Sequence, residues 1–308
     1  MSSFDPILRC ANLSQSYGEK KVLHELEFEV GGGAVGLLGP NGSGKTTLLR
    51  TLLGLLPVQA GCAQVLGMDP ALSPLALRRR IGLVPESECL VPGMNAVELT
   101  GYAGELTGMS SKDAMQRAHQ VLYYVGLGEA RYRDLETYSQ GMKQRLKLAQ
   151  ALVHDPELVF LDEPTNGMDP PGRETMLALI REISHTKGVS VILSSHLLPD
   201  VQETCDSVLI LKDGRLKSQE AVSHDPLHEH LLFEVRGRGD LQGLGEALRV
   251  RGHDFTPIQN GIRVRLKEGV GGPEPILQTA LSLDSGVEIR HLMPAGRTVE
   301  DTFFEAID

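Results

Sequence analysis

The sequence contains no tryptophan, only four cysteines and no long apolar run. A helix that crosses a bilayer needs about 20 mostly apolar residues, so we expect no membrane-spanning segment. The first ten residues, MSSFDPILRC, lack the basic region and the apolar stretch of a secretory signal. The cysteines are scattered without a C-x-x-C pair, which favours reduced thiols over disulfides or a zinc site.

Basic residues are also under-represented, since 30 Lys and Arg face 40 Asp and Glu, for a net charge of −10. This balance argues mildly against a nucleic-acid-binding surface. With 41% hydrophobic and 23% charged residues, the composition is that of an ordinary globular protein. A length of 308 residues suits one large domain or two ordinary ones, with ample material for a core.

Short apolar runs alternate with helical periodicity through the first two thirds of the chain. The expected buried strands are 34–38, 81–84, 158–161, 189–193 and 208–211, and the expected helices are 46–55, 95–106, 112–125, 142–153 and 173–184. Such alternation predicts an α/β fold with a mainly parallel sheet covered on both faces. Antiparallel strands over 7–9 and 26–30 precede it, and 86–140 reads as a helical insertion without a strand.

The character of the sequence changes near residue 222, which ends the expected first domain, 1–222. Residues 223–230 are polar and turn-prone, as in a linker. The remaining segment, 231–308, predicts a small α+β domain. Its expected strands are 232–235, 261–266 and 287–289, and its expected helices are 241–250, 276–283 and 299–307.

A phosphate-binding motif stands between the expected strand 34–38 and the helix that follows it. The pattern G-x-x-x-x-G-K-[ST] is matched by Gly39, Pro40, Asn41, Gly42, Ser43, Gly44, Lys45 and Thr46, with Thr47 next. Glycines let the backbone N–H groups wrap a phosphate, and the start of the helix adds a positive dipole end. In this motif the lysine reaches the β- and γ-phosphates of ATP, and the Thr46 hydroxyl binds Mg²⁺.

Two adjacent carboxylates, Asp162 and Glu163, follow the apolar strand 158–161. Acids at the end of a buried strand need a partner, because an unpaired buried charge is costly. We expect Asp162 to hold Mg²⁺ and Glu163 to act as a general base toward a water that attacks the γ-phosphate.

A third segment, Ser139-Gln140-Gly141-Met142, comes just before an expected helix. Its serine hydroxyl and backbone N–H groups can bind an anion at the start of the helix. The same serine can instead be an ordinary N-cap, which physical reasoning alone favours.

In order and spacing these segments resemble the ATP-binding cassette (ABC) ATPases over about residues 4–222. The P-loop is common to many nucleotide-binding proteins, but a Ser-x-Gly segment 23 residues before Asp162 is highly specific. The form Tyr138-Ser139-x-Gly141-Met142 departs from the usual Leu-Ser-Gly-Gly-Gln and is similar to that of drug, antibiotic and polysaccharide exporters.

The resemblance implies roles for four single residues. Tyr17 would stack on adenine, and His196 would hydrogen-bond the γ-phosphate next to the base Glu163. Glu86 replaces the glutamine that usually contacts Mg²⁺ and the attacking water, so it adds a negative charge there. Asp169 would join the two sites across a dimer.

The resemblance also implies partners. Two cassettes, as a homodimer or heterodimer, would hold Mg²⁺ and ATP between the P-loop of one and residues 139–142 of the other. ATP hydrolysis would drive a separate integral membrane permease, with this chain peripheral on the cytoplasmic face. Export is the expected direction, no nucleic acid is expected, and 231–308 would dimerise or regulate.

The alternative is a soluble ABC ATPase that acts on nucleic acid or ribosomes. Such proteins usually carry two cassettes or a long coiled-coil insertion, and the sequence shows neither. A P-loop kinase for a small molecule fits less well, because it would have no use for the Ser-x-Gly segment or for His196.

Overall fold

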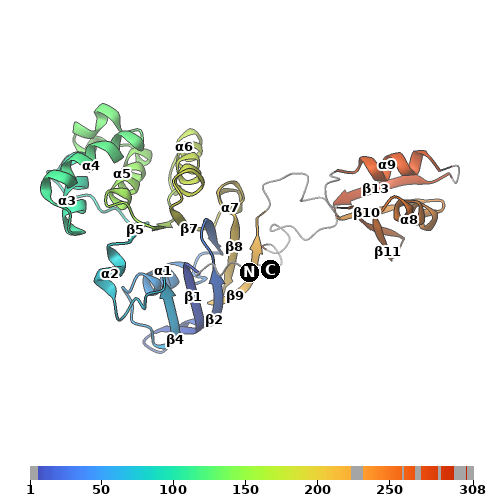
Figure 1. The fold of residues 1–308 in the computed structure, drawn as a ribbon, viewed down its shortest axis with the longest axis horizontal. Coiled ribbons are helices and arrows are strands. Elements are labelled where there is room, and N and C mark those ends of the chain that lie inside the picture. The colour runs from blue at the N-terminus through green and yellow to red at the C-terminus, as the bar shows by residue number, and fades with distance from the viewer. Residues whose placement is uncertain are drawn as a thin grey trace. The chain divides into compact units, whose positions relative to one another are not determined.

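A computed structural model of the chain describes residues 6–222, 232–258, 260–267, 272–283, 286–294 and 303 (Figure 1). The chain forms two compact units, which meet in sequence after Val222. The expected linker, 223–230, lies outside the described residues, as does the final helix, 299–307, apart from Phe303. In the described part of the chain, no helix combines the length and the apolar character needed to cross a bilayer.

The first unit is built on a six-stranded sheet with the strand order β5-β6-β7-β3-β8-β9. These strands are β3 (Ala34–Leu38), β5 (Ile81–Val84), β6 (Leu158–Asp162), β7 (Ser190–Ser195), β8 (Ser207–Lys212) and β9 (Arg215–Ala221). The first five strands in that order are parallel, and β9 pairs with β8 in the antiparallel sense. Every residue of β3, β6 and β7 is buried, as expected for a parallel sheet covered on both faces. The mainly parallel α/β core is therefore confirmed.

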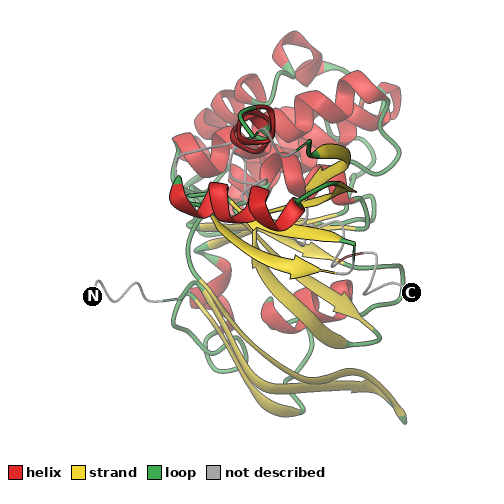
Figure 2. Ribbon diagram, turned by 90° about the vertical axis from the view of Figure 1, so that its right-hand side faces the viewer, coloured by secondary structure: helices red, strands yellow, loops and turns green. Residues whose placement is uncertain are grey.

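A second, antiparallel sheet pairs β2 (Lys20–Val30) with β1 (Leu8–Tyr17) and β1 with β4 (Ala60–Val65), and its long strands lie at the bottom of Figure 2. Helix α1 (Lys45–Leu52) shares one hydrophobic core with both sheets through Leu48 and Leu52. Strand β4 was not predicted, because four of its residues are exposed and only Ala63 and Val65 are buried.

The helical insertion lies between β5 and β6, as predicted (Figure 1). It comprises α3 (Ala96–Leu106), α4 (Ser111–Tyr124), two 3₁₀ turns (Gly128–Tyr132 and Leu135–Thr137) and the start of α5 (Gln140–Leu152). A capping box fixes the start of α3, where the Asn95 side chain accepts from the Glu98 N–H at 3.0 Å and Glu98 accepts from the Asn95 N–H at 2.9 Å.

Three further helices complete the first unit: α2 (Pro74–Arg78), α6 (Pro170–Arg181) and α7 (Leu198–Thr204). The prediction that a helix begins at residue 173 was wrong, since α6 starts at Pro170. Two prolines occupy its first turn, where a missing N–H is harmless. A π-helical turn, Glu182–Thr186, continues α6.

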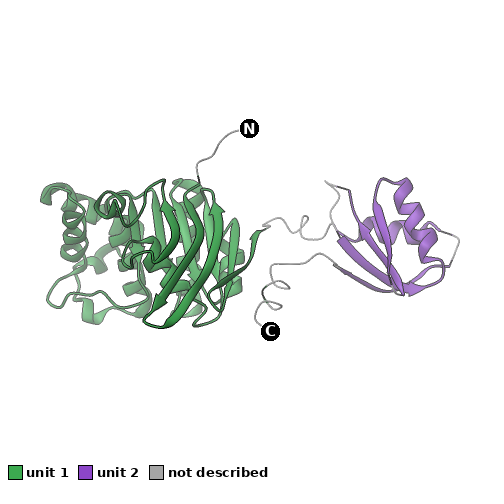
Figure 3. Ribbon diagram, turned by 90° about the horizontal axis from the view of Figure 1, so that it is seen from below, with its two compact units in different colours: residues 1–222, 303–308 green, residues 223–302 purple. Residues whose placement is uncertain are grey.

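The second unit has the order β10 (Leu232–Arg238), α8 (Leu241–Val250), β11 (Asp254–Ile258), β12 (Gly261–Arg265), α9 (Glu274–Leu281) and β13 (Glu288–Pro294). Its sheet is antiparallel with the order β11-β12-β10-β13, and both helices pack on one face of it (Figure 3). The predicted α+β domain is present, but strand β11 was missed. The strand contains Pro257, and β11 is an edge strand, where a proline is tolerated.

An ion pair with a buried carboxylate ties α6 to α7. Asp200 is fully buried, and its carboxylate accepts from Arg173 Nε at 2.6 Å and from Thr165 Oγ1 at 2.6 Å. Removing one partner of a buried pair leaves an uncompensated charge, so we expect Arg173→Met to lower the free energy of unfolding by about 3 kcal/mol. Urea unfolding measures this value.

The matched control for that change is Arg181→Met on the same helix. Arg181 pairs with Glu203 at 3.2 Å on the surface, where such a pair contributes about 1 kcal/mol or less. Equal losses of stability in the two variants would contradict the role given to Asp200.

Candidate functional site

The predicted site residues converge because they follow neighbouring parallel strands. The P-loop follows β3, and Glu86 follows β5. Asp162 ends β6 with Glu163 directly after it, and His196 follows β7. Carboxyl ends of parallel strands share one edge of the sheet, which is where such folds bind their ligands. The register aligns Asp162 with Ser194, at the end of β7.

The P-loop has the backbone of a phosphate cradle. Gly42 and Gly44 have φ values of +82° and +104°, a region that favours glycine, and a Cβ on Gly44 would lie 2.7 Å from Leu23. Lys45 is only 6% exposed, and its Nζ donates to the carbonyls of Gly39 at 2.7 Å and Pro40 at 3.3 Å. Burial lowers the pKa of Lys45, while the carboxylates of Glu163, Asp162 and Glu86 oppose that shift. The ammonium is thus held at the loop that phosphates would fill.

Glu163 is placed as a general base. It is buried, and it has a left-handed φ of 51°, a strained conformation for a residue other than glycine. Its Oε2 lies 2.9 Å from His196 Nδ1, and its Oε1 lies 3.8 Å from Lys45 Nζ. Burial raises the pKa of the Glu163 carboxyl, and the neighbouring His196 and Lys45 oppose the rise. A carboxylate with a raised pKa is better matched to removing a proton from water.

The residues expected to hold Mg²⁺ form a suitable set of oxygen ligands. Thr46 Oγ1 donates to Asp162 Oδ2 at 3.1 Å, and Ser194 Oγ holds the other carboxylate oxygen at 2.9 Å. Neighbouring ligands on an octahedral Mg²⁺ lie about 3 Å apart, so the Thr46–Asp162 spacing fits the ion. The buried Ser43 Oγ has no hydrogen-bond partner among the described residues, which leaves a polar atom for a ligand.

A cavity of about 620 Å³ lies over this edge of the sheet. It is lined by Tyr17, Lys20, Val22, Asn41, Gly42, Gly44, Lys45, Thr46, Thr47, Glu86, Glu163, Asn166 and His196. Tyr17, at the end of β1, is 46% exposed, so one face of its ring is open to stacking. Sequence reasoning gave no role to Lys20, Val22, Asn166 or Ser194. Their only signal was nearness in sequence to Tyr17, Glu163 and His196.

The signature residues Ser139, Gln140, Gly141 and Met142 and the carboxylate Asp169 do not belong to the described lining of this cavity. Ser139 is the N-cap of α5, and its Oγ accepts from the Met142 N–H at 3.3 Å. Asp169 stands at the N-cap position of α6, but its side chain makes no capping hydrogen bond there. The N-cap interpretation thus holds for Ser139, and the chain does not bring these residues to its own P-loop.

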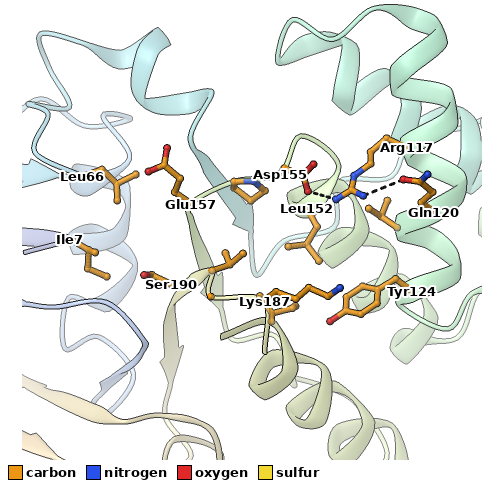
Figure 4. Close-up of a pocket in the computed structure, with 15 residues that line it drawn as sticks. Ile7, Leu66, Arg117, Gln120, Tyr124, Leu152, Asp155, Glu157, Lys187 and Ser190 are labelled. Atoms are coloured by element: carbon orange, nitrogen blue, oxygen red, sulfur yellow. Dashed lines mark hydrogen bonds and ion pairs between the residues drawn. The ribbon is translucent and has the colours of Figure 1, made fainter. Parts of the chain in front are cut away.

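A second cavity, of about 730 Å³, lies at the opposite ends of β6 and β7 (Figure 4). Its cations already have partners. Arg117 pairs with Asp155, and Lys187 Nζ lies 4.4 Å from the centre of the Tyr124 ring. The wall also carries the carboxylate of Glu157 and no glycine-rich loop. This chemistry disfavours a polyphosphate, so the P-loop cavity is the better candidate for a nucleotide site.

Comparison with known proteins decides the family. The family model described as ABC transporter matches residues 23–166. Over 304 residues the chain is 31% identical to the bacitracin transport ATP-binding protein BcrA of Bacillus licheniformis, covering 98% of this chain and 97% of that protein. The chain belongs to the ABC transporter ATP-binding proteins. These are ATPases, so the predictions of family and enzyme class are confirmed.

Two other ABC proteins extend this likeness. The Nod factor export ATP-binding protein I of Cupriavidus metallidurans is 33% identical over 307 residues, 97% of this chain and 96% of that protein. A solved structure described as an ATP-binding subunit of an ABC transporter superposes with a TM-score of 0.63 at 29% identity. The match covers 70% of this chain and 90% of the chain in that structure, and it confirms the cassette fold.

The adenine role of Tyr17 predicts a measurable loss of affinity. Aromatic stacking on a base contributes about 1–3 kcal/mol, so Tyr17→Ala should weaken ATP binding by about 5- to 150-fold in calorimetry. Tyr17→Phe should bind normally, and inorganic tripolyphosphate should bind both variants equally. Tyr123→Ala, an exposed tyrosine on α4, is the control. Normal ATP affinity in Tyr17→Ala would contradict the stacking role.

Proposed function

We propose that this chain is the ATPase subunit of an ABC exporter. The observation that carries the proposal is the convergence of Lys45, Thr46, Asp162, Glu163 and His196 at one edge of the sheet. Export is supported by the relatives named for bacitracin transport and Nod factor export, which match almost the whole chain. The protein acts at the cytoplasmic face of the membrane and drives a separate integral membrane permease.

Each residue of the P-loop site has its own role in ATP hydrolysis. Lys45 exchanges its hydrogen bonds to the loop carbonyls for contacts with the β- and γ-phosphates. Glu163 accepts a proton from the attacking water, and His196, at 2.9 Å, orients its carboxylate. Thr46, Asp162 and Glu86 would hold Mg²⁺, which would supply positive charge to offset that of the phosphates.

The complete site needs two copies of the cassette. In the proposed head-to-tail pair, Ser139 and Gly141 of one copy meet the γ-phosphate held by the P-loop of the other. The N–H groups at the start of α5 then contribute their positive dipole end. Asp169, which makes no capping bond, contacts the partner. The second unit serves dimerisation or regulation, and its inclusion in the full-length similarity to the two exporters supports this.

Affinity purification from detergent-solubilised native membranes tests the assignment. We expect a polytopic membrane protein to co-purify, and ATP hydrolysis to respond to it. Co-purification with ribosomes or DNA instead would favour the soluble alternative, which the net charge of −10 already disfavours.

A further inference from the structure

A buried lysine outside the predicted site holds the segment that carries Glu86. Lys147, on the third turn of α5, is only 4% exposed. Its Nζ donates to three successive carbonyls, those of Pro85 at 2.6 Å, Glu86 at 3.3 Å and Ser87 at 3.3 Å. An ammonium has three N–H donors, so these carbonyls use all of them.

The same helix makes a second, weaker contact with this segment one turn earlier. Lys143 pairs with Glu88 at 2.8 Å, and the Glu88 side chain is 58% exposed. Residues four apart lie on one face of a helix, so α5 meets the segment 85–88 along one side. Because Ser139 caps α5, one helix connects the signature residues to the segment that carries Glu86.

The ammonium also lies among acidic groups. Burial lowers the pKa of Lys147, and this shift is opposed by the Cys89 thiol and by the carboxylates of Glu88, Glu86 and Asp162. A buried charge needs partners to be tolerated, and here the partners include two of the expected Mg²⁺ ligands. The resemblance implies that most ABC ATPases carry an uncharged glutamine at the position that corresponds to Glu86.

We propose that Lys147 is a positioning residue that fixes the backbone of residues 85–87 and offsets the extra negative charge of Glu86. The three carbonyl contacts set where the Glu86 side chain leaves the end of β5, and the ammonium balances that side chain beside the nucleotide. This inference rests on the proposed ATPase function of the site.

The first test measures the nucleotide-free protein and is therefore independent of hydrolysis. Hydrogen–deuterium exchange of the amide N–H groups at residues 85–90, where Pro85 has none, should rise in Lys147→Met, because the segment loses the contacts that hold its backbone in place. Lys143→Met removes only the exposed ion pair and should leave that exchange close to the parent value. Unchanged exchange at 85–90 in Lys147→Met overturns the proposal, whether or not the protein hydrolyses ATP.

The second test separates charge balance from general stability. Lys147→Met should lower kcat by about tenfold, as expected for the loss of a buried charge-assisted hydrogen bond, with a smaller change in KM. Lys147→Arg, which keeps the charge, should recover most of the loss. In a Glu86→Gln background, where no extra charge needs balance, Lys147→Met should have a much smaller effect. An equal loss in both backgrounds overturns the charge role.

Discussion

Glu163→Gln is expected to reduce ATP hydrolysis by about 10²–10⁴-fold, the usual contribution of a general base. The amide keeps the size of the side chain and can still accept a hydrogen bond from His196, now 2.9 Å from the carboxylate. It cannot take a proton from water. ATP affinity in calorimetry should remain, since Lys45 and the P-loop are intact, and the variant should accumulate as an ATP-bound dimer.

A carboxylate at the other end of the same strand provides the control. Glu157 immediately precedes β6 and pairs with Arg80 on the surface at 2.5 Å. Glu157→Gln should hydrolyse ATP at close to the parent rate. If Glu163→Gln released phosphate as fast as the parent protein, another group would have to be the base.

Lys45→Ala is expected to remove most of the ATP affinity. The ammonium is buried at the mouth of the P-loop, and charge-assisted hydrogen bonds contribute about 1.5–3 kcal/mol each. Two phosphates lose their partner, so affinity should fall by at least about 100-fold in calorimetry. The substitution leaves the φ values of Gly42 and Gly44, and hence the cradle, unchanged.

The second cavity offers the matched control for that loss. Lys187 lies in the larger cavity of Figure 4, against the Tyr124 ring. Lys187→Ala should bind ATP as the parent does. If Lys187→Ala lost ATP affinity and Lys45→Ala bound ATP normally, the nucleotide would have to bind in the second cavity, which would contradict the P-loop assignment.

Local patterns were enough to predict the five parallel strands of the central sheet and the P-loop. Strands β3, β6 and β7 are buried along their whole length, so each appears in the sequence as a short apolar run. Strands β4, β9 and β11 were not predicted, because their sequences lack a strand-like apolar pattern. Pairing and packing with the adjacent strands, rather than their own composition, hold them in an extended conformation. Four of the seven β9 residues are exposed, and none is buried.

Contacts between the side chains of the site were harder to predict from the sequence. The P-loop and the Asp162-Glu163 pair are contiguous motifs, which single stretches of sequence reveal. Ser194 and Lys147 act across the fold, the first on the Asp162 carboxylate and the second on carbonyls about 60 residues away. A lysine within a helix pattern gives no sign of burial, so only the three-dimensional structure shows what Lys147 holds.

The most direct test of the composite site mixes two inactive variants. Lys45→Ala disables the P-loop, and Ser139→Asp adds a negative charge where the γ-phosphate of the partner would lie. Aspartate is as good an N-cap as serine, so α5 should still form. We predict that each variant alone is inactive and that the mixture hydrolyses ATP, because a mixed dimer contains one intact site. A mixture no more active than its components would contradict a site shared between two chains.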